Sequence, residues 1–326
     1  MPECTYAQAL NMALREELQR DSRVVLMGED IAVHGGVFGI TRGLLTEFGA
    51  SRVRDTPISE SAFIGLAVGA AMTGLRPVAE VMYVDFMLVA ADPVMNQAAK
   101  MRYMTGGQVS VPMVIRTQQG GGRGNAAQHS QSLDALFAHV PGLKVVLPST
   151  PADARGLLKA AIRDDNPVVF IEHKLLYPTR GEVPDVQPPM AMGIADVKRS
   201  GSDVTVVALS RSVLHALEAA QTLAQEGISV EVIDPRTVRP LDVETIVASV
   251  RRTNRLVLVH EAVGFGSVLS EIAATIQELA FDWLDAPIVR VSGADAPIAH
   301  SKPLEDAQLP NPARIAAAIR SVFSGR

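Results

Sequence analysis

The sequence is poor in several residue types, and each shortage excludes a class of protein. Cys4 is the only cysteine among 326 residues, so the chain cannot form an internal disulfide. The formal net charge of -5 offers no basic surface, and we expect neither nucleic acid nor a membrane as a partner. The single cysteine and the lack of a signal-peptide pattern predict a cytoplasmic protein.

Long apolar runs are missing as well, although 48% of the residues are hydrophobic. The most apolar stretch, which follows Glu60, is shorter than the ~20 residues that a membrane span requires. No internal repeat or low-complexity tract is evident. A chain of this length and composition is expected to form two domains, each with its own hydrophobic core.

The stretch that begins at Pro57 combines one carboxylate with a run of small and apolar residues. We expect Ser59 to cap a helix whose first residue is Glu60, with Gly65 and Gly69 removing bulk from one helix face. Such a face lets a second backbone approach, as in a subunit interface. Glu60 has two interpretations: a charge that stabilises the positive helix end, or a carboxylic acid in a dry pocket that exchanges a proton with a heteroaromatic nitrogen.

Strand patterns and helix patterns alternate along the chain. Before a proline-rich linker at 177–193, helices are predicted up to Arg20, at 60–71, at 85–104 with a kink near Pro93, and after Thr150, between strands at 24–27, 77–83, 111–116, 143–147 and 168–172. Beyond the linker, strands at 204–209, 229–233, 256–259 and 288–291 alternate with helices at 213–225, 243–252, 267–280 and 312–323. This order predicts an α/β protein of two domains, each a mostly parallel sheet flanked by helices.

A glycine cluster at 120–124 precedes a histidine in the segment AAQHSQS. Asn125 stands where a dinucleotide-binding fingerprint needs its third glycine, which argues against a nicotinamide-dependent dehydrogenase and for a loop. His129, behind this loop, is compatible with a surface turn or with a catalytic group. His260 and Glu261 begin like a zinc-protease motif, but the second histidine of that motif is missing, so we expect no metal there.

Several stretches, in order along the chain, resemble one enzyme family. They are DTPISE, GAAMTGLRPVAE, NQAAKMRYM, AAQHSQS, GLKVVLPSTPADARGLL and AIRDDNPVVF. Nearly end to end, the sequence is similar to the beta subunits of the thiamine-diphosphate-dependent component of 2-oxo acid and acetoin dehydrogenase complexes. The resemblance implies a pyrimidine-binding domain at 1–177, a linker at 178–193 and a transketolase C-terminal-like domain at 194–326.

The resemblance also implies roles for individual residues. Glu60 matches the glutamate that hydrogen-bonds the pyrimidine ring of thiamine diphosphate. It would favour the imino tautomer, whose nitrogen takes the proton from the thiazolium carbon and so generates the ylid nucleophile. Ile58, Met82 and Phe86 match positions that pack on the pyrimidine ring. His129 matches the family's active-site histidine, which makes it a candidate proton donor near the reacting carbonyl.

A monovalent cation is a further implication of the resemblance. In related beta subunits, backbone and side-chain oxygens hold such an ion, and oxygen-only ligation suits a hard cation such as K⁺. The matching residues here are Met113, Ala161, Ile162, Asp164 and Asn166. From the residues alone, the segment at 161–166 is also compatible with a solvated turn.

The sequence contains no Gly-Asp-Gly, the motif with which thiamine enzymes begin the site for Mg²⁺ and the diphosphate. An isolated carboxylate and some apolar side chains cannot neutralise a diphosphate. In the family an alpha subunit carries the missing motif and holds Mg²⁺, and the site lies between the subunits of an α₂β₂ tetramer. The resemblance therefore implies an alpha subunit and a dihydrolipoamide acyltransferase core as partners.

Three hypotheses about function remain open. Met82 and Phe86 favour a pyruvate or acetoin enzyme over the branched-chain type, and we expect a pyruvate-type dehydrogenase. Acetoin cleavage is the alternative, because MNQAAKMRYM, PSTPADARGLL and EHKLLY resemble acetoin-type subunits. The third is a non-catalytic assembly subunit that has kept the fold, against which the presence of both Glu60 and His129 argues.

Overall fold

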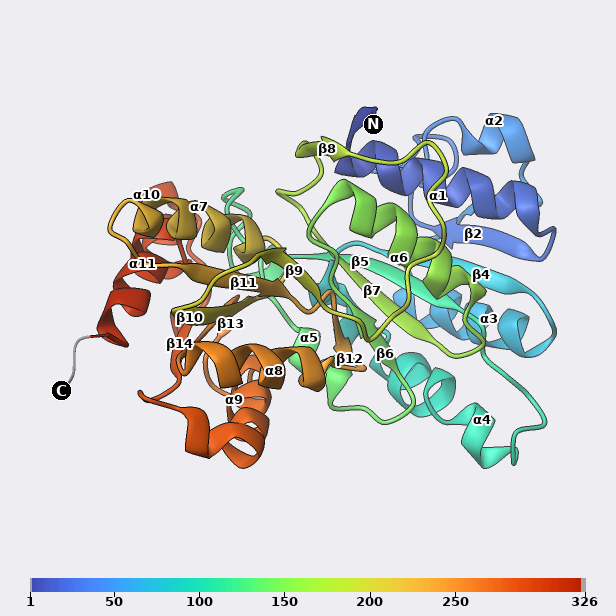
Figure 1. Cartoon of the computed structure of the whole chain (residues 1–326). Coiled ribbons are helices and arrows are strands. Elements are labelled where there is room, and N and C mark those ends of the chain that lie inside the picture. The colour runs from blue at the N-terminus through green and yellow to red at the C-terminus, as the bar shows by residue number, and fades with distance from the viewer. Residues whose placement is uncertain (1, 324–326) are drawn as a thin grey trace. The chain divides into compact units, whose positions relative to one another are not determined.

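The computed structural model describes residues 2–323, and the chain divides into two compact units (Figure 1). The first unit extends to Gln119 and resumes at Leu136–Met192, whereas the second contains Gly120–Ala135 and the chain from Gly193 onward. The segment Gly120–Ala135, which the sequence placed in the first domain, therefore belongs to the second unit. The domain limits predicted at 177 and 194 stay predictions.

A parallel sheet forms the centre of the first unit. Its strands are hydrogen-bonded in the order β6 (Lys144–Val146), β7 (Val168–His173), β5 (Val114–Gln119), β4 (Arg76–Val81), β2 (Val24–Gly28) and β3 (Val53–Asp55). Strands β2, β5 and β7 are buried along their whole length. Continuous burial is typical of parallel strands that are covered by helices on both faces.

Helices cover both faces of this sheet, with α1 (Tyr6–Arg20) and α6 (Pro151–Arg163) on one side and α3 (Glu60–Met72) on the other (Figure 1). The predicted capping box of α1 is confirmed, because Thr5 and Gln8 each accept a hydrogen bond from the other's backbone. The first unit also contains α2 (Leu44–Phe48) and an antiparallel pair of β1 (Glu3–Thr5) and β8 (Arg180–Glu182). Strand β8 lies inside the segment predicted to be a linker.

Helix α3 begins at Glu60, as predicted, but its cap differs from the expectation. The side chain of Ser59 makes no capping hydrogen bond. One side of α3 is buried in the unit, and the side that carries Gly65, Leu66 and Gly69 is exposed. A Cβ atom added at either glycine would meet nothing within 4 Å, so no other backbone segment within residues 2–323 packs against the low-bulk face.

The helix predicted for residues 85–104 is interrupted around Pro93, as expected, but the whole segment is less regular than predicted. The chain instead forms a 3₁₀ turn η1 (Val84–Leu88), a π-helical turn η2 (Pro93–Ala98) and a short helix α4 (Met101–Met104). Pro93 has no backbone N–H and a fixed φ angle, which interrupts the regular hydrogen-bond ladder. The ladder continues in the π pattern, in which the Ala99 N–H donates to the Val94 oxygen at 3.1 Å.

The second unit contains a sheet with the strand order β14 (Val289–Gly293), β13 (Leu256–Val263), β10 (Val204–Ala208), β11 (Val230–Asp234) and β9 (Asp196–Arg199). Only β9 pairs antiparallel with its neighbour. Its helices are α7 (Ser212–Ala224), α8 (Val243–Thr253), α9 (Val268–Ala280), α10 (Lys302–Gln308) and α11 (Pro312–Ser321). A core of Val, Ala, Leu and Ile side chains lies between strands β10, β11 and β13 and helices α7 and α11.

The remaining short elements are η3 (Ala127–His129), α5 (Asp134–Ala138), β12 (Thr237–Arg239) and η4 (Phe281–Trp283). Two α/β units with mostly parallel sheets confirm the predicted fold class. Among the described helices, none combines the length and the apolar character that crossing a membrane requires.

Candidate active site

Three neighbouring strands of the first sheet bring their carboxyl ends to one edge. Strand β2 lies between β3 and β4, and Gly28 pairs in register with Asp55 on one side and Glu80 on the other. The Thr56 N–H donates to the Gly28 oxygen at 3.0 Å, which ties the segment after β3 to the end of β2. The residues that follow these strands therefore leave the sheet at a common edge, where α/β proteins place their sites.

Glu60 reaches this edge as the first residue of α3, and its side chain is only 7% exposed. Glu29, which directly follows β2, lies near enough for the two carboxylates to interact. Burial, the charge of Glu60 and the charge of Asp30 together raise the pKa of Glu29 to about 7. The Oε1 atom of Glu29 is buried without a hydrogen-bond partner among the described residues. The edge thus holds a pair of acidic groups, one of which keeps its proton near neutral pH.

Apolar side chains accompany the two carboxyl groups. Ile58, two residues before Glu60, is 83% exposed. Met82 follows β4 and Phe86 lies in η1, and both are partly exposed. Leu88 and Val89 continue the exposed apolar surface. An acidic group beside uncovered apolar side chains suits a flat heteroaromatic ring that has a basic nitrogen.

A buried ionic network supports the middle of the same sheet. The guanidinium of Arg116 on β5 donates to Glu80 on β4 at 2.5 Å and to Glu172 on β7 at 2.7 and 2.9 Å. The Tyr177 hydroxyl donates to Glu172 at 2.6 Å. Burial by itself would lower the pKa of Arg116, but Glu172 and Glu80 outweigh it and raise the pKa, so the arginine stays charged. The network fixes three strands relative to one another.

Aromatic rings extend from this network toward Met82. The Phe38 ring lies between Tyr177, with centroids 4.7 Å apart, and Tyr83, with centroids 6.0 Å apart. The Lys174 Nζ atom lies 4.6 Å from the centroid of the Tyr83 ring. Because Tyr83 is the neighbour of Met82 in the chain, these contacts hold the segment after β4 in place. Sequence patterns gave no signal for this cluster.

His129 belongs to the second unit, whereas Glu60, Ile58, Met82 and Phe86 belong to the first. It ends the 3₁₀ turn η3 and is partly buried. The structure therefore brings four of the five predicted site residues to one sheet edge and places the histidine on the glycine-rich segment of the other unit. Glu29 was not among the predicted residues; its position directly after a buried strand was the available signal.

Four of the residues predicted to hold a monovalent cation lie at the end of α6 or just after it, and the fifth, Met113, directly precedes β5. The Arg76 Nη1 atom donates to the backbone oxygens of Ile162 and Asp164, both at 3.0 Å. The Asp164 carboxylate forms an ion pair with Lys144 and accepts the Asn166 side-chain N–H at 2.8 Å. Each carbonyl has a second lone pair, so the oxygens keep acceptor capacity for a cation. Within residues 2–323, no group of three or more His, Cys, Asp or Glu side chains is arranged so that it could hold a metal ion.

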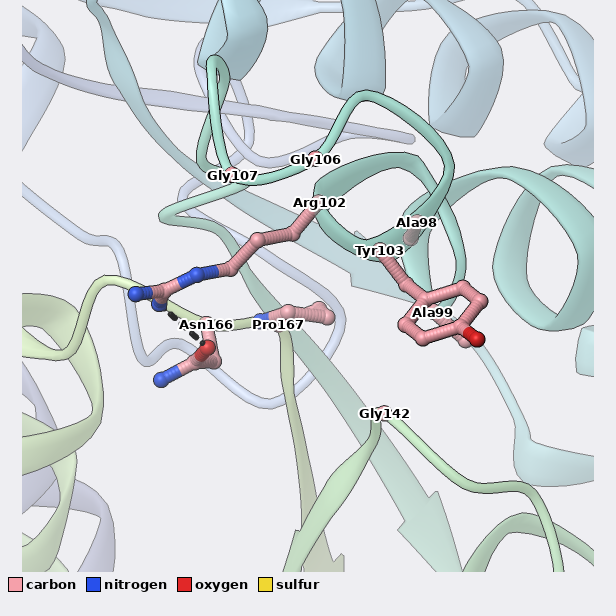
Figure 2. Close-up of a pocket in the computed structure, with 9 residues that line it drawn as sticks. All are labelled: Ala98, Ala99, Arg102, Tyr103, Gly106, Gly107, Gly142, Asn166 and Pro167. Atoms are coloured by element: carbon pink, nitrogen blue, oxygen red, sulfur yellow. Dashed lines mark hydrogen bonds between the residues drawn. The ribbon is translucent and has the colours of Figure 1, made fainter.

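A cavity of about 470 Å³ opens in the first unit near α4, lined by Ala98, Ala99, Arg102, Tyr103, Gly106, Gly107, Gly142, Asn166 and Pro167. Figure 2 shows the Arg102 guanidinium directed at the Asn166 side chain, where Nη1 donates to Oδ1 at 2.8 Å. Gly142 and Pro167 come just before β6 and β7, so the cavity lies at the amino ends of these strands. It is therefore separate from the edge that carries Glu60.

Two family models and several curated relatives match this sequence. Residues 3–180 match the family model "Transketolase, pyrimidine binding domain", and residues 193–315 match "Transketolase, C-terminal domain". The 2-oxoisovalerate dehydrogenase subunit beta of Bacillus subtilis is 47% identical over 99% of both chains. An acetoin:2,6-dichlorophenolindophenol oxidoreductase subunit beta of Cupriavidus necator is 48% identical over 97% of this chain and 96% of that one.

Two further comparisons cover nearly the whole chain. The pyruvate dehydrogenase E1 component subunit beta of Rhizobium meliloti is 47% identical over 99% of this chain and 70% of its own length. A solved structure titled "Split gene transketolase, inactive beta4 tetramer" has a TM-score of 0.81 over 98% of both chains at 24% identity, which shows the shared fold. The chain thus belongs to the transketolase-like family of thiamine-diphosphate-dependent enzymes, and within it to the beta subunits of 2-oxo acid and acetoin dehydrogenases.

Proposed function

We propose that this chain is the beta subunit of a pyruvate-type 2-oxo acid dehydrogenase and that it provides the half-site for the pyrimidine ring of thiamine diphosphate. The observation that carries the proposal is the buried carboxyl of Glu60 at the sheet edge, next to the exposed side chain of Ile58. When bound, the cofactor supplies a carbanion that adds to the substrate carbonyl. The chain supplies proton control and orientation.

Glu60 would hold a proton at the pyrimidine ring nitrogen, because a carboxyl sheltered from water forms a strong hydrogen bond with a basic nitrogen. Ile58, Met82 and Phe86 would contact the ring and keep water from it. The carboxyl of Glu29 keeps its proton near neutral pH, which limits the negative charge beside Glu60. His129 would donate a proton to the oxygen of the reacting carbonyl.

The diphosphate requires a partner. The acidic side chain of Glu60 and the apolar side chains of Ile58, Met82 and Phe86 offer no positive charge to a phosphate group. We propose that an alpha subunit holds the diphosphate with Mg²⁺ and completes an α₂β₂ tetramer. The exposed small and apolar face of α3, with Gly65, Leu66 and Gly69, would be covered by a neighbouring subunit of that tetramer, because a helix that is apolar on all sides is normally buried.

Two finer proposals concern an ion and a second partner. The carbonyl oxygens of Ile162 and Asp164, already oriented by Arg76, would hold K⁺ together with Met113, Ala161 and Asn166.

The acyl group would pass to the lipoyl group of a dihydrolipoamide acyltransferase core. A cytoplasmic location fits the single cysteine.

Acetoin cleavage is the second candidate function, and the beta subunit of Cupriavidus necator supports it at 48% identity. The same cofactor geometry serves both substrates. A test is to assemble the chain with its alpha subunit and compare pyruvate, branched 2-oxo acids and acetoin in a dye-reduction assay. We expect the highest kcat/KM with pyruvate. A preference for acetoin would select the alternative, and no turnover of any substrate would support a non-catalytic subunit.

A further inference from the structure

The glycine-rich segment that carries His129 is held by two carboxylates of the second unit. The Gly121 N–H donates to Glu261 Oε1 at 2.5 Å, and the Gly122 N–H donates to Glu305 Oε1 at 2.7 Å. The Gly124 N–H lies 3.2 and 3.1 Å from the two carboxylate oxygens of Glu305. Glu261 comes from β13 and Glu305 from α10, so two separate elements hold one loop.

Both carboxylates are removed from water. Glu305 is 0% exposed and Glu261 is 9% exposed. A buried carboxylate is stable only if it is hydrogen-bonded, and three backbone N–H groups supply these bonds here. Successive backbone N–H groups of this kind form a concavity that binds anions. In this protein the bound anion is the carboxylate of Glu305.

The glycines of the segment are the residues that this arrangement needs. Gly122 has φ +96° and Gly124 has φ +69°, which side chains with a Cβ rarely adopt. A Cβ at Gly121 would lie 3.1 Å from Leu309 Cδ1 and 3.4 Å from Glu305 Oε1. The glycine cluster is therefore fitted to the carboxylate of Glu305.

A second attachment lies on the other side of His129 in the chain. The His260 Nε2 atom lies 2.8 Å from Asp134 Oδ1, and both side chains are buried. Burial would lower the pKa of His260, but Asp134 and Glu261 outweigh it and raise the pKa. Residues 120–134 are thus fixed at both ends by β13 and α10.

The backbone between these attachments is strained. Ala126, three residues before His129, has φ +62° and ψ −168°, a combination that is almost restricted to glycine. Such a conformation persists only where the surroundings determine it. The hydrogen bonds of Glu305 and Glu261 end two residues before Ala126, and the Asp134 contact follows eight residues after it.

We propose that Glu305 is a positioning residue for His129: its carboxylate holds the glycine segment so that the histidine occupies one place. The proposal rests on the role of His129 in the proposed function. It explains why the second unit carries on α10 a buried acidic side chain that accepts hydrogen bonds from the loop. Loss of the Glu305 charge would let the segment move, and kcat would fall more than KM would change.

The test compares Glu305→Gln with wild type in the assembled complex with the alpha subunit and thiamine diphosphate. Asp306→Asn is the matched control, because Asp306 is the next residue of α10 and forms an exposed ion pair with Lys302. We expect amide hydrogen exchange in residues 120–128 to rise at least tenfold in Glu305→Gln, with kcat reduced at least tenfold and cofactor affinity within about twofold. Asp306→Asn should match wild type in all three.

Unchanged exchange in Glu305→Gln, or raised exchange with unchanged kcat, would overturn the proposal. Gly122→Ala disturbs the same contact from the loop side. It should also raise amide exchange and lower kcat while leaving cofactor affinity nearly unchanged, and it provides the test even if Glu305→Gln does not fold. Glu305→Asp keeps the charge and should restore part of the protection. His129→Ala separates the two claims: full activity in His129→Ala removes the histidine from the mechanism, whereas the exchange result in Glu305→Gln still reports on the loop.

Discussion

At the scale of single residues, the candidate site depends on two carboxyl groups with different surroundings. Glu60 is the first residue of α3 and is largely buried. Glu29 lies beside it without a hydrogen-bond partner for its buried oxygen among the described residues, and its pKa rises to about 7. A carboxylic acid with a raised pKa beside a second carboxyl group is a common feature of sites for proton transfer.

The raised pKa of Glu29 predicts a pH-dependent stability. The folded chain binds this proton more tightly than the unfolded chain, in which a glutamate has a pKa of about 4.3. Its stabilising effect is therefore complete below the unfolded value and is lost as the pH rises through about 7. Thermal unfolding from pH 4 to 8 should show wild type losing stability relative to Glu29→Gln as the pH rises. Parallel curves for the two proteins would contradict the assignment.

The buried network around Arg116 predicts a large loss of stability from one substitution. Arg116→Leu leaves Glu80 and Glu172 buried without their cation, and breaking a buried pair in this way costs about 3–5 kcal/mol. Arg320→Leu is the control, because the Arg320 to Glu226 pair is exposed to solvent and should contribute little to stability. Urea unfolding of both variants measures the difference. Equal losses would show that burial of the network has no energetic consequence.

At the scale of elements, helices and strands with a regular hydrophobic period could be predicted from the sequence. Contacts between distant segments could not. The helix at Glu60–Met72 and the strand at Val24–Gly28 follow from local patterns. The segment from Asp85 to Met104 was predicted as a helix interrupted near Pro93, and the structure replaces most of it with a 3₁₀ turn, a π-helical turn and one short helix. The open face of α3 could be inferred from its glycines, although its partner is not in this chain.

The exposed face of α3 predicts a substitution that separates folding from assembly. Gly65→Leu should leave the isolated chain as stable as wild type or more stable by about 0.5–1 kcal/mol, because leucine favours helix and meets no neighbour. The added side chain should weaken association with the alpha subunit at least tenfold. Ala224→Leu at an exposed position of α7 is the control and should not affect association. Titration calorimetry and thermal unfolding measure both quantities, and undiminished association of Gly65→Leu would exclude this face from the interface.

At the scale of the whole molecule, the proposed half-site belongs to the first unit, and the segment that carries His129 belongs to the second. The attachment of Gly120–Ala135 to the second unit was not predictable, because Glu261 and Glu305 lie 140 and 183 residues beyond the glycines that they bind. The fold class and the residues at the sheet edge followed from strand order and from sequence resemblance. Glu29 and Glu305 did not, since their roles depend on burial and on partners distant in sequence.

The central claim is that the sheltered carboxyl of Glu60 controls the proton chemistry of a cofactor shared with an alpha subunit. The most direct test is the rate of hydrogen exchange at the thiazolium C2 carbon of thiamine diphosphate bound to the assembled complex. We predict that Glu60→Gln slows this exchange by about 10²-fold or more, with the cofactor still bound. An exchange rate within a few-fold of wild type at equal cofactor occupancy would contradict the claim.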